Sequence, residues 1–310
     1  MITIPDVDSL MAGELGGWLA GQTEARKEAK RKAWVRWIGG IVLGAPLTLL
    51  LGADSFGTTL IGFSGLIIIM VGFGLGMMVR QKMTETLKAE MNGALAKALD
   101  IRYSLKVAEG SEFRLANTFG LLPSYDRRRL EDLWEGEIAG TTFRMYEATL
   151  IERQGSGKDA RDVTVFRGVI LKIHFARDFH GVTLVERQRR RMTLFGDSQT
   201  RGGIKLERIR MVDPGFEDVF DVYGNDPVEA RYLVHPAYCE RLIALETQFK
   251  GKKLKALFHK GDVIVTVSAQ DMFESGSLNP AQDRARLAKT IEQFRAMAGL
   301  IISLNERVRA

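Results

Sequence analysis

The sequence predicts an α+β protein that combines a two-helix transmembrane hairpin with a cytosolic domain, in which helices pack on an antiparallel sheet. Three observations support this fold class. Residues 34–79 are almost continuously apolar, with Arg36 and Asp54 as the charged exceptions. Residues 161–175 alternate between apolar and polar side chains with the period of a strand, and residues 279–310 carry an apolar stripe at helical spacing.

The apolar stretch divides into two expected membrane helices, at residues 34–51 and 58–79. The second helix carries no charge over 22 residues, and a bilayer core needs about 20 apolar helical residues. The first is short of a full span unless Trp34, Val35 and the stem of Arg36 are counted, so a re-entrant segment or a buried core helix is the alternative. The short connection between them predicts that the two helices are antiparallel neighbours.

Basic residues flank both ends of the apolar stretch and are missing from its connecting loop. This asymmetry predicts a multi-pass protein of the inner membrane with cytoplasmic N and C termini, and Trp34 and Trp37 fit the headgroup region on the same side. The formal net charge of +6 suits a chain beside an anionic lipid bilayer, so binding to nucleic acid is not needed to explain it. The single cysteine, Cys239, excludes an intramolecular disulfide and fits a reducing cytosol.

The remaining segments follow from their local patterns. Residues 1–33 are expected to form a cytosolic or interfacial helix, and residues 80–100 an amphipathic stalk with apolar residues at every fourth position. The cytosolic α+β domain is expected over residues 101–278, with strand hairpins that turn at residues 139–140 and 259–262 and a long half-buried strand at 161–175. Residues 187–203 are interpreted as a loop, and residues 279–310 as a C-terminal helix.

Two pairs of glycines lie four residues apart inside the apolar stretch, namely Gly40 with Gly44 and Gly72 with Gly76. Small residues at this spacing let helix backbones approach closely, which makes all four candidates for helix association. Two alternatives stay open at this point, packing of the two helices within one hairpin or association between protomers of a homo-oligomer. A channel is the more ambitious form of the second alternative, but the apolar stretch offers few polar side chains for a pore.

Two further sets of polar residues are candidates for binding. Arg187, Arg189, Arg190 and Arg191 form a basic run that is interpreted as a solvated loop, with an anionic partner as the alternative. The run lacks interleaved aromatic residues, which argues against binding of single-stranded nucleic acid. Glu229 and Arg231 would project to the same side of an extended segment, where they are expected to form a structural polar pair, with a polar ligand site as the alternative.

Several motifs follow one another through the cytosolic domain: Tyr125-Asp126, Glu137-Ile-Ala-Gly140-Thr-Thr-Phe143, Phe166-Arg-Gly168, Phe179-x-Gly181 and Val222-Tyr223-Gly-Asn-Asp-Pro-Val-Glu229-Ala-Arg231-Tyr-Leu. Together, over about residues 83–268, they resemble the bacterial membrane-protein family known as domain of unknown function 3137. The resemblance implies a bacterial origin, a membrane location and an α+β cytosolic domain. It implies no catalytic residue, because the family has no assigned activity.

Residues with catalytic or ligating chemistry are sparse. The four histidines lack a second ligand at metal-binding spacing, and the segment 155–158 fails the phosphate-loop pattern, so no metal, cofactor or catalytic residue is expected. The favoured function is a non-enzymatic inner-membrane protein whose cytosolic domain binds an unidentified membrane or cytosolic protein, or scaffolds a membrane assembly. The alternative is a homo-oligomeric channel or transport accessory subunit, and an enzyme acting near the membrane has the least support.

Overall fold

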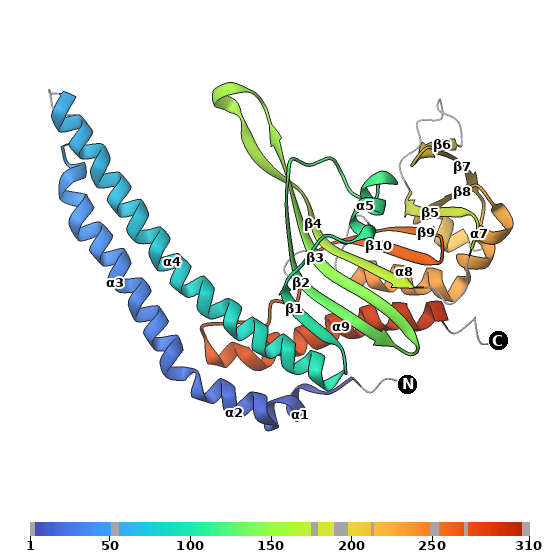
Figure 1. Cartoon of the computed structure of the whole chain (residues 1–310), viewed down its shortest axis with the longest axis horizontal. Helices are drawn as coiled ribbons and strands as arrows, with labels where there is room; N and C mark the ends of the chain where they lie inside the picture. Colours follow the sequence, from blue (N-terminus) through green and yellow to red (C-terminus); the bar gives the residue numbers. More distant parts are fainter. Residues whose placement is uncertain are drawn as a thin grey trace. The chain divides into compact units, whose positions relative to one another are not determined.

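The computed structural model describes residues 4–50, 56–174, 179–188, 198–211, 214–248, 254–269 and 272–305. Its internal contacts divide the chain into two compact units (Figure 1). The helical unit consists of Asp6–Ala94 and Glu274–Lys289, and the α+β unit consists of Leu95–Phe273 with Met1–Pro5 and Thr290–Ala310. The segment 274–289 thus groups with the N-terminal helices, which differs from the expected boundary between residues 278 and 279.

Four helices precede the sheet: α1 (Val7–Ala12), α2 (Glu14–Gly21), α3 (Thr23–Thr48) and α4 (Phe56–Ala98). The helix expected over residues 1–33 is therefore divided, because the extended backbone of Gly13 separates α1 from α2, and Gln22 separates α2 from α3. α3 runs without a break from the basic tract into the first apolar stretch. α4 is one continuous helix that includes both the second apolar stretch and the amphipathic segment after it.

α3 and α4 lie side by side in opposite directions (Figure 1). Two side chains of α3 donate hydrogen bonds to backbone carbonyls of α4. Arg36 Nη1 donates to the oxygen of Leu75 at 2.9 Å, and Trp37 Nε1 donates to the oxygen of Phe73 at 3.1 Å. The expected antiparallel pair of helices is therefore present in the structure.

Ion pairs with two buried cations, Arg26 and Lys88, join the segment 274–289 to the other helices of the helical unit. Arg26 of α3 is 1% exposed, and its Nη1 donates to Asp283 Oδ2 at 2.8 Å. Lys88 of α4 forms an ion pair with Glu274, with 2.9 Å between Lys88 Nζ and Glu274 Oε1. Burial raises the pKa of Asp283 above its ordinary value, although the hydrogen bond from Arg26 opposes this shift. A buried charge needs its partner, so the pair between Arg26 and Asp283 fixes the start of the C-terminal helix against α3.

The α+β unit is built on one ten-stranded sheet with the strand order β1-β2-β3-β4-β10-β9-β5-β8-β7-β6, in which every neighbouring pair is antiparallel. The expected antiparallel sheet is confirmed. Its strands are β1 (Arg102–Lys106), β2 (Arg127–Ile138), β3 (Thr141–Gln154), β4 (Arg161–His174), β5 (Val182–Arg187), β6 (Ser198–Arg201), β7 (Ile204–Ile209), β8 (Phe220–Gly224), β9 (Lys255–His259) and β10 (Asp262–Ser268). The predicted hairpins turn at Ala139-Gly140 and Lys260-Gly261, where all four residues have positive φ.

Helices cover both faces of the sheet's centre. On one face, α5 (Ser111–Thr118) places Phe113 in a buried cluster that includes Leu257 of β9. On the other face, the ring of Tyr238 in α8 (Pro236–Gln248) lies 5.4 Å from that of Phe258. Successive residues of a strand point to opposite faces, so Leu257 and Phe258 are buried in different layers. The remaining helices are α6 (Pro214–Glu217), α7 (Pro227–Leu233), α9 (Asp283–Asn305) and the 3₁₀ turns Gly157–Asp159 and Pro280–Gln282.

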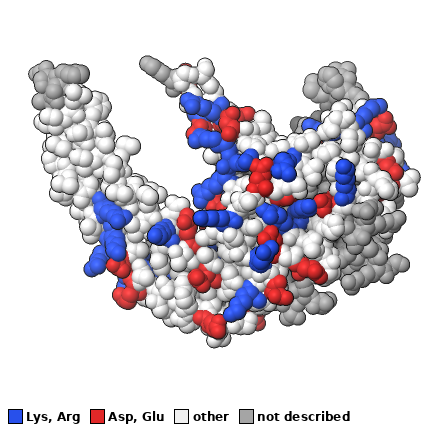
Figure 2. Space-filling view, in the orientation of Figure 1, with Lys and Arg blue, Asp and Glu red and all other residues white. Residues whose placement is uncertain are grey.

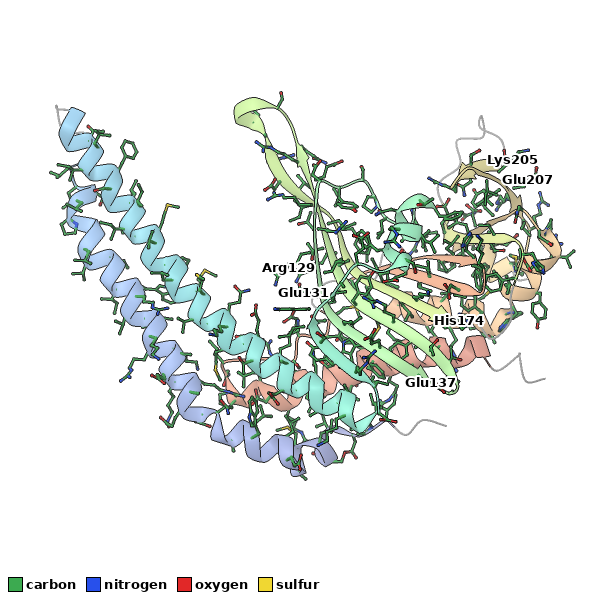
Figure 3. The ribbon with its side chains drawn as sticks, in the orientation of Figure 1. Arg129, Glu131, Glu137, His174, Lys205 and Glu207 are labelled. Carbon is green, nitrogen blue, oxygen red and sulfur yellow. The ribbon has the colours of Figure 1, made fainter. Side chains whose placement is uncertain are left out.

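Charged side chains mark the parts of the sheet that remain in water (Figure 3). In β2, Arg129 Nη2 lies 2.8 Å from Glu131 Oε2. In β7, Lys205 Nζ lies 3.0 Å from Glu207 Oε1. Each pair occupies alternate positions of one strand and therefore one face. Such exposed pairs contribute little to stability, but they mark the face of each strand that is in contact with water.

Some elements differ from the expectation. The sequence patterns did not predict β1, α5, β7 or β8, and the segment 187–203 contains β6, which pairs with β7 across Gly202-Gly203. The long strand β4 is half buried only at its beginning. Ile170 and Leu171 point to opposite faces and are both fully buried, because helices cover both sides of the sheet there.

Replacing Arg26 by Met should lower the free energy of unfolding by about 3–5 kcal/mol, because the Asp283 carboxylate then stays buried without a partner. The matched control is Lys27→Met, which removes only an exposed pair with Glu24 and should have little effect. Urea unfolding of the full chain in detergent, followed by tryptophan fluorescence, measures both variants. Equal stabilities for the two variants would contradict the structural role of Arg26.

Candidate functional site

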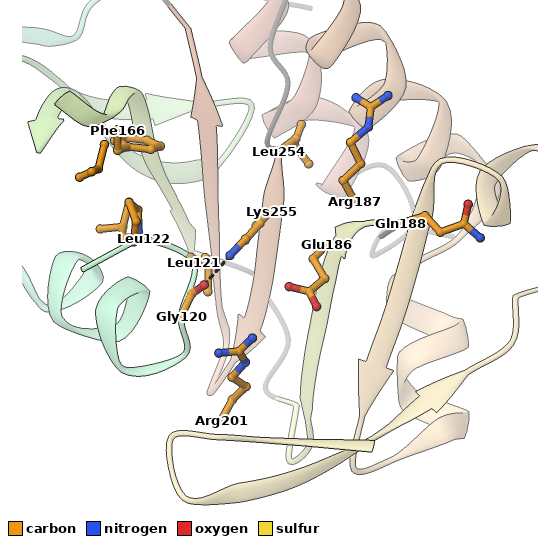
Figure 4. Close-up of a pocket in the computed structure, with 12 residues that line it drawn as sticks. Gly120, Leu121, Leu122, Phe166, Glu186, Arg187, Gln188, Arg201, Leu254 and Lys255 are labelled. Carbon is orange, nitrogen blue, oxygen red and sulfur yellow. Dashed lines mark hydrogen bonds between the residues drawn. The ribbon is translucent and has the colours of Figure 1, made fainter. Parts of the chain in front are cut away.

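The α+β unit contains a cavity of about 540 Å³ beside the loop that follows α5 (Figure 4). Residues 120–123 of that loop form one wall, and Phe166 of β4, Glu186 of β5, Arg201 of β6 and Lys255 of β9 contribute to the others. The strand order β9-β5 places Glu186 directly opposite Lys255. A cavity of this volume suits a small ligand or a few side chains of a partner.

Three charged side chains converge on this cavity (Figure 4). Lys255 Nζ donates to the carbonyl oxygen of Gly120 at 2.5 Å. The buried carboxylate of Glu186 accepts from Gln199 Nε2 at 3.4 Å, and Gln199 Oε1 in turn accepts from Arg201 Nε at 3.1 Å. Hydrogen bonds therefore hold the ammonium and guanidinium groups in place before any ligand arrives.

The rest of the lining is mainly apolar, with Leu121, Leu122, Val165, Phe166 and Leu254. Among the residues described, the lining includes no histidine, cysteine, serine or threonine. What it offers is an apolar wall next to three cations, Arg187, Arg201 and Lys255, and the carboxylate of Glu186. This arrangement can bind a group that carries an acidic function beside an apolar one.

Of the predicted basic run, the structure describes Arg187, whereas Arg189, Arg190 and Arg191 lie outside the described residues. Arg187 ends β5, is exposed and lines the cavity. The structure thus brings one candidate arginine to the same site as Arg201 and Lys255. Sequence reasoning missed these two residues, which carry no local motif and meet only through the order of the strands.

Glu229 and Arg231 lie in the helix α7, so the expectation of an extended segment is wrong. The preceding residues explain the helix. Asp226 is the N-cap, and its Oδ1 accepts from the backbone N–H groups of Val228 and Glu229 at 2.9 and 3.0 Å. Pro227 occupies the first turn, where its missing N–H costs nothing.

The two side chains bind different backbone segments instead of each other. The Glu229 carboxylate accepts from the N–H of His180 at 3.0 Å and from the N–H of Gly181 at 2.6 Å. Arg231 Nε donates to the carbonyl oxygen of Arg210 at 3.2 Å. Glu229 therefore holds the start of β5 against α7, a structural role that does not involve Arg231.

The four candidate glycines all face the contact between α3 and α4: Gly40, Gly44, Gly72 and Gly76. A Cβ atom placed on Gly40 would lie 3.1 Å from the Cα atom of Gly72, and one on Gly44 would lie 2.5 Å from the carbonyl oxygen of Gly65. Gly76 faces the indole of Trp37. This placement favours the alternative in which the glycines pack within one hairpin.

Large apolar side chains of α3 and α4 point outward, with Leu43 67% and Met70 72% exposed, and Leu49, which caps the end of α3, is 84% exposed. In the other described segments, the large exposed apolar side chains are Val228 and Tyr232. Figure 2 shows that charged residues gather at one end of the helix pair and are missing from much of its visible surface. By length and composition alone, α4 is the one helix in the described part of the chain that is able to cross a membrane.

Cys239 and His259 are packing residues in this structure. Cys239 of α8 is 2% exposed, and its thiol donates to the oxygen of Val234 at 3.8 Å. The ring of His259 lies 5.2 Å from that of Phe119, and its pKa is lowered, first by burial and then by the neighbouring Lys260. Neither residue lines the cavity of the α+β unit.

A comparison with protein-family models agrees with the resemblance seen in the sequence. Residues 164–306 match the family model described as "Protein of unknown function (DUF3137)". The crystal structure of the mycobacterial trehalose monomycolate transport factor A, TtfA, is similar with 11% identity and a TM-score of 0.34, covering 72% of this chain and 96% of that one. The search of curated proteins found no match.

Replacing Glu229 by Ala should lower the free energy of unfolding by about 1–3 kcal/mol, because the N–H groups of His180 and Gly181 lose their acceptor. Amide exchange at Gly181 should accelerate in this variant and much less in Glu229→Gln, which keeps an acceptor oxygen. Arg231→Ala is the matched control on the same helix. Unchanged exchange at Gly181 in the Ala variant would contradict the role of Glu229.

Proposed function

We propose a binding role for this chain, which belongs, through residues 164–306, to the DUF3137 family of proteins of unknown function. The description of this family names no reaction that could be assigned to the chain. In this proposal the protein is non-enzymatic and is anchored in a bacterial cytoplasmic membrane. α3 and α4 cross the bilayer as an antiparallel hairpin. The α+β unit lies on the cytoplasmic side and binds a partner at its cavity.

The observation that carries the proposal is the outward exposure of large apolar side chains along α3 and α4. A contiguous apolar surface of this kind needs a non-aqueous environment or a partner. Residues 58–79 of α4 span about 33 Å at 1.5 Å per residue, which matches a hydrocarbon core of about 30 Å. Lipid is therefore the environment that fits both the length and the chemistry of this helix.

α3 is proposed as the second membrane helix, although its uncharged apolar part begins only at Trp37. Arg36 Nη1 donates to the carbonyl oxygen of Leu75, so one donor of this guanidinium is already bound to α4 where the charge would lie at the headgroup level. The basic residues from Arg26 to Arg36 precede α3's apolar part, and Arg80 and Lys82 follow that of α4. Under the positive-inside rule both flanks are cytoplasmic.

The α+β unit is proposed to bind an acidic segment of a membrane or cytosolic protein. The apolar wall of its cavity and the cations Arg201 and Lys255 support this choice. Arg187 adds a third positive charge to the lining. A scaffold role follows directly, because a protein bound there is tethered to the membrane through the hairpin.

The geometry does not favour the alternative of a homo-oligomeric channel. The candidate glycines face the partner helix within one chain. Thr48 and Ser64 donate to carbonyl oxygens of their own helices, those of Ala45 and Ile61, so their hydroxyl protons are already bound within the helix. A transport accessory role remains compatible with the proposed anchor and its bound partner.

Cysteine accessibility tests the proposed topology. In a Cys239→Ser background, a membrane-impermeant maleimide added to intact spheroplasts should label Leu49→Cys, because this residue would lie at the far end of the hairpin. Ser9→Cys and Ser104→Cys should react only after the membrane is permeabilised. Alkaline carbonate should leave the chain in the membrane pellet. Labelling of Ser104→Cys before permeabilisation, or release of the chain by carbonate, would refute the proposal.

A further inference from the structure

A second cavity, of about 740 Å³, lies within the helical unit where the apolar side chains of α3 and α4 give way to charged ones. Trp37 of α3 and Phe73, Met77 and Arg80 of α4 form part of its lining. Trp37 is held by its hydrogen bond to the Phe73 carbonyl oxygen and by stacking on the Phe73 ring, with 5.3 Å between centroids. The Arg80 guanidinium lies 5.4 Å from the centroid of the Trp37 ring.

The charge of this cavity has one sign. Lys30, Arg80 and Arg286 contribute three cations to the lining, which contains no aspartate or glutamate among the residues that the structure describes. Arg286 Nη1 donates to the backbone oxygen of Gly276 at 2.8 Å, and its Nε donates to the amide oxygen of Gln282 at 3.3 Å. These acceptors are neutral, and the nearby Asp283 carboxylate, which interacts electrostatically with Arg286, is itself paired with Arg26. The three cations of the lining therefore suit an anion.

An apolar track leads to the cavity along one face of α4. Leu66, Met70, Phe73 and Met77 follow one another at steps of four, three and four residues and are 41%, 72%, 53% and 53% exposed. This spacing places them in one stripe, and Arg80 is the next residue on the same face. The track is about 16 Å long at 1.5 Å per residue, and it joins an apolar surface to a cationic pocket.

We propose that this cavity binds the phosphate group of an anionic membrane lipid, with an acyl chain of that lipid along the track. Guanidinium and ammonium groups are the side chains that recognise phosphate, and an indole is favoured at the interface between hydrocarbon and water. The inference rests on the proposed insertion of α3 and α4, which places the track in hydrocarbon. A soluble phosphate compound would use the cations but not the track.

Native mass spectrometry of the full chain in a neutral detergent tests this inference, with phosphatidylglycerol and phosphatidylcholine as probes. Phosphatidylglycerol should bind more tightly than phosphatidylcholine. The variant Lys30→Gln/Arg80→Gln should lose about tenfold or more in affinity for it, because charge-assisted contacts to the phosphate are removed. The matched control Lys27→Gln/Arg31→Gln removes the same number of positive charges, both from the basic tract of α3 and outside the cavity, and should leave the affinity nearly unchanged.

Equal losses in the two double variants would overturn the inference and assign the effect to the general attraction of the basic tract. Inorganic phosphate that displaces phosphatidylglycerol at comparable concentration would overturn the lipid assignment in favour of a free anion. Fractionation separates this inference from the proposed function. A chain that resists carbonate extraction but shows no preference for phosphatidylglycerol contradicts the lipid site alone, whereas a chain released by carbonate contradicts the membrane anchor.

Discussion

The close backbone contact between Gly40 of α3 and Gly72 of α4 decides how the apolar side chains of both helices are distributed. With glycines on the inner faces, the helices touch through backbone atoms, and little apolar side-chain surface is needed between them. The large residues, such as Leu43 and Met70, therefore point outward. Such an arrangement leaves the hairpin without a core of its own in water. It is stable where the surroundings are themselves apolar, which is the physical reason for proposing a bilayer.

The two units differ in how their positively charged side chains are paired with carboxylates. In the helical unit, Arg26 and Lys88 are paired with carboxylates from the segment 274–289, so the deepest cations are neutralised internally. The cavity at the end of the apolar track keeps its cations without a carboxylate in its described lining. The cavity of the α+β unit instead combines cations with the buried carboxylate of Glu186. These differences support a lipid phosphate at the cavity of the helical unit and an acidic protein segment at the cavity of the α+β unit.

Local sequence patterns predicted the antiparallel helix pair and the strand hairpins at Ala139-Gly140 and Lys260-Gly261, because each depends on neighbouring residues alone. The site in the α+β unit depends on the strand order β9-β5, which joins Glu186 to Lys255 across distant parts of the chain, and no periodicity encodes that order. The role of Glu229 was missed for a related reason. Its partners are backbone N–H groups 48 and 49 residues away in the chain. Every residue except proline has such a group, so the sequence does not reveal which ones Glu229 binds.

The central claim, that the outer surface of α3 and α4 faces lipid, is tested most directly by a nitroxide scan of α4 over residues 60–79 in lipid nanodiscs. Power saturation compares the access of oxygen, which concentrates in hydrocarbon, with that of a water-soluble nickel chelate. We expect high oxygen and low nickel access at outward positions such as Ile67 and Met70, with Ser104 of the α+β unit showing the reverse. Nickel access at Ile67 and Met70 equal to that at Ser104 would contradict the claim.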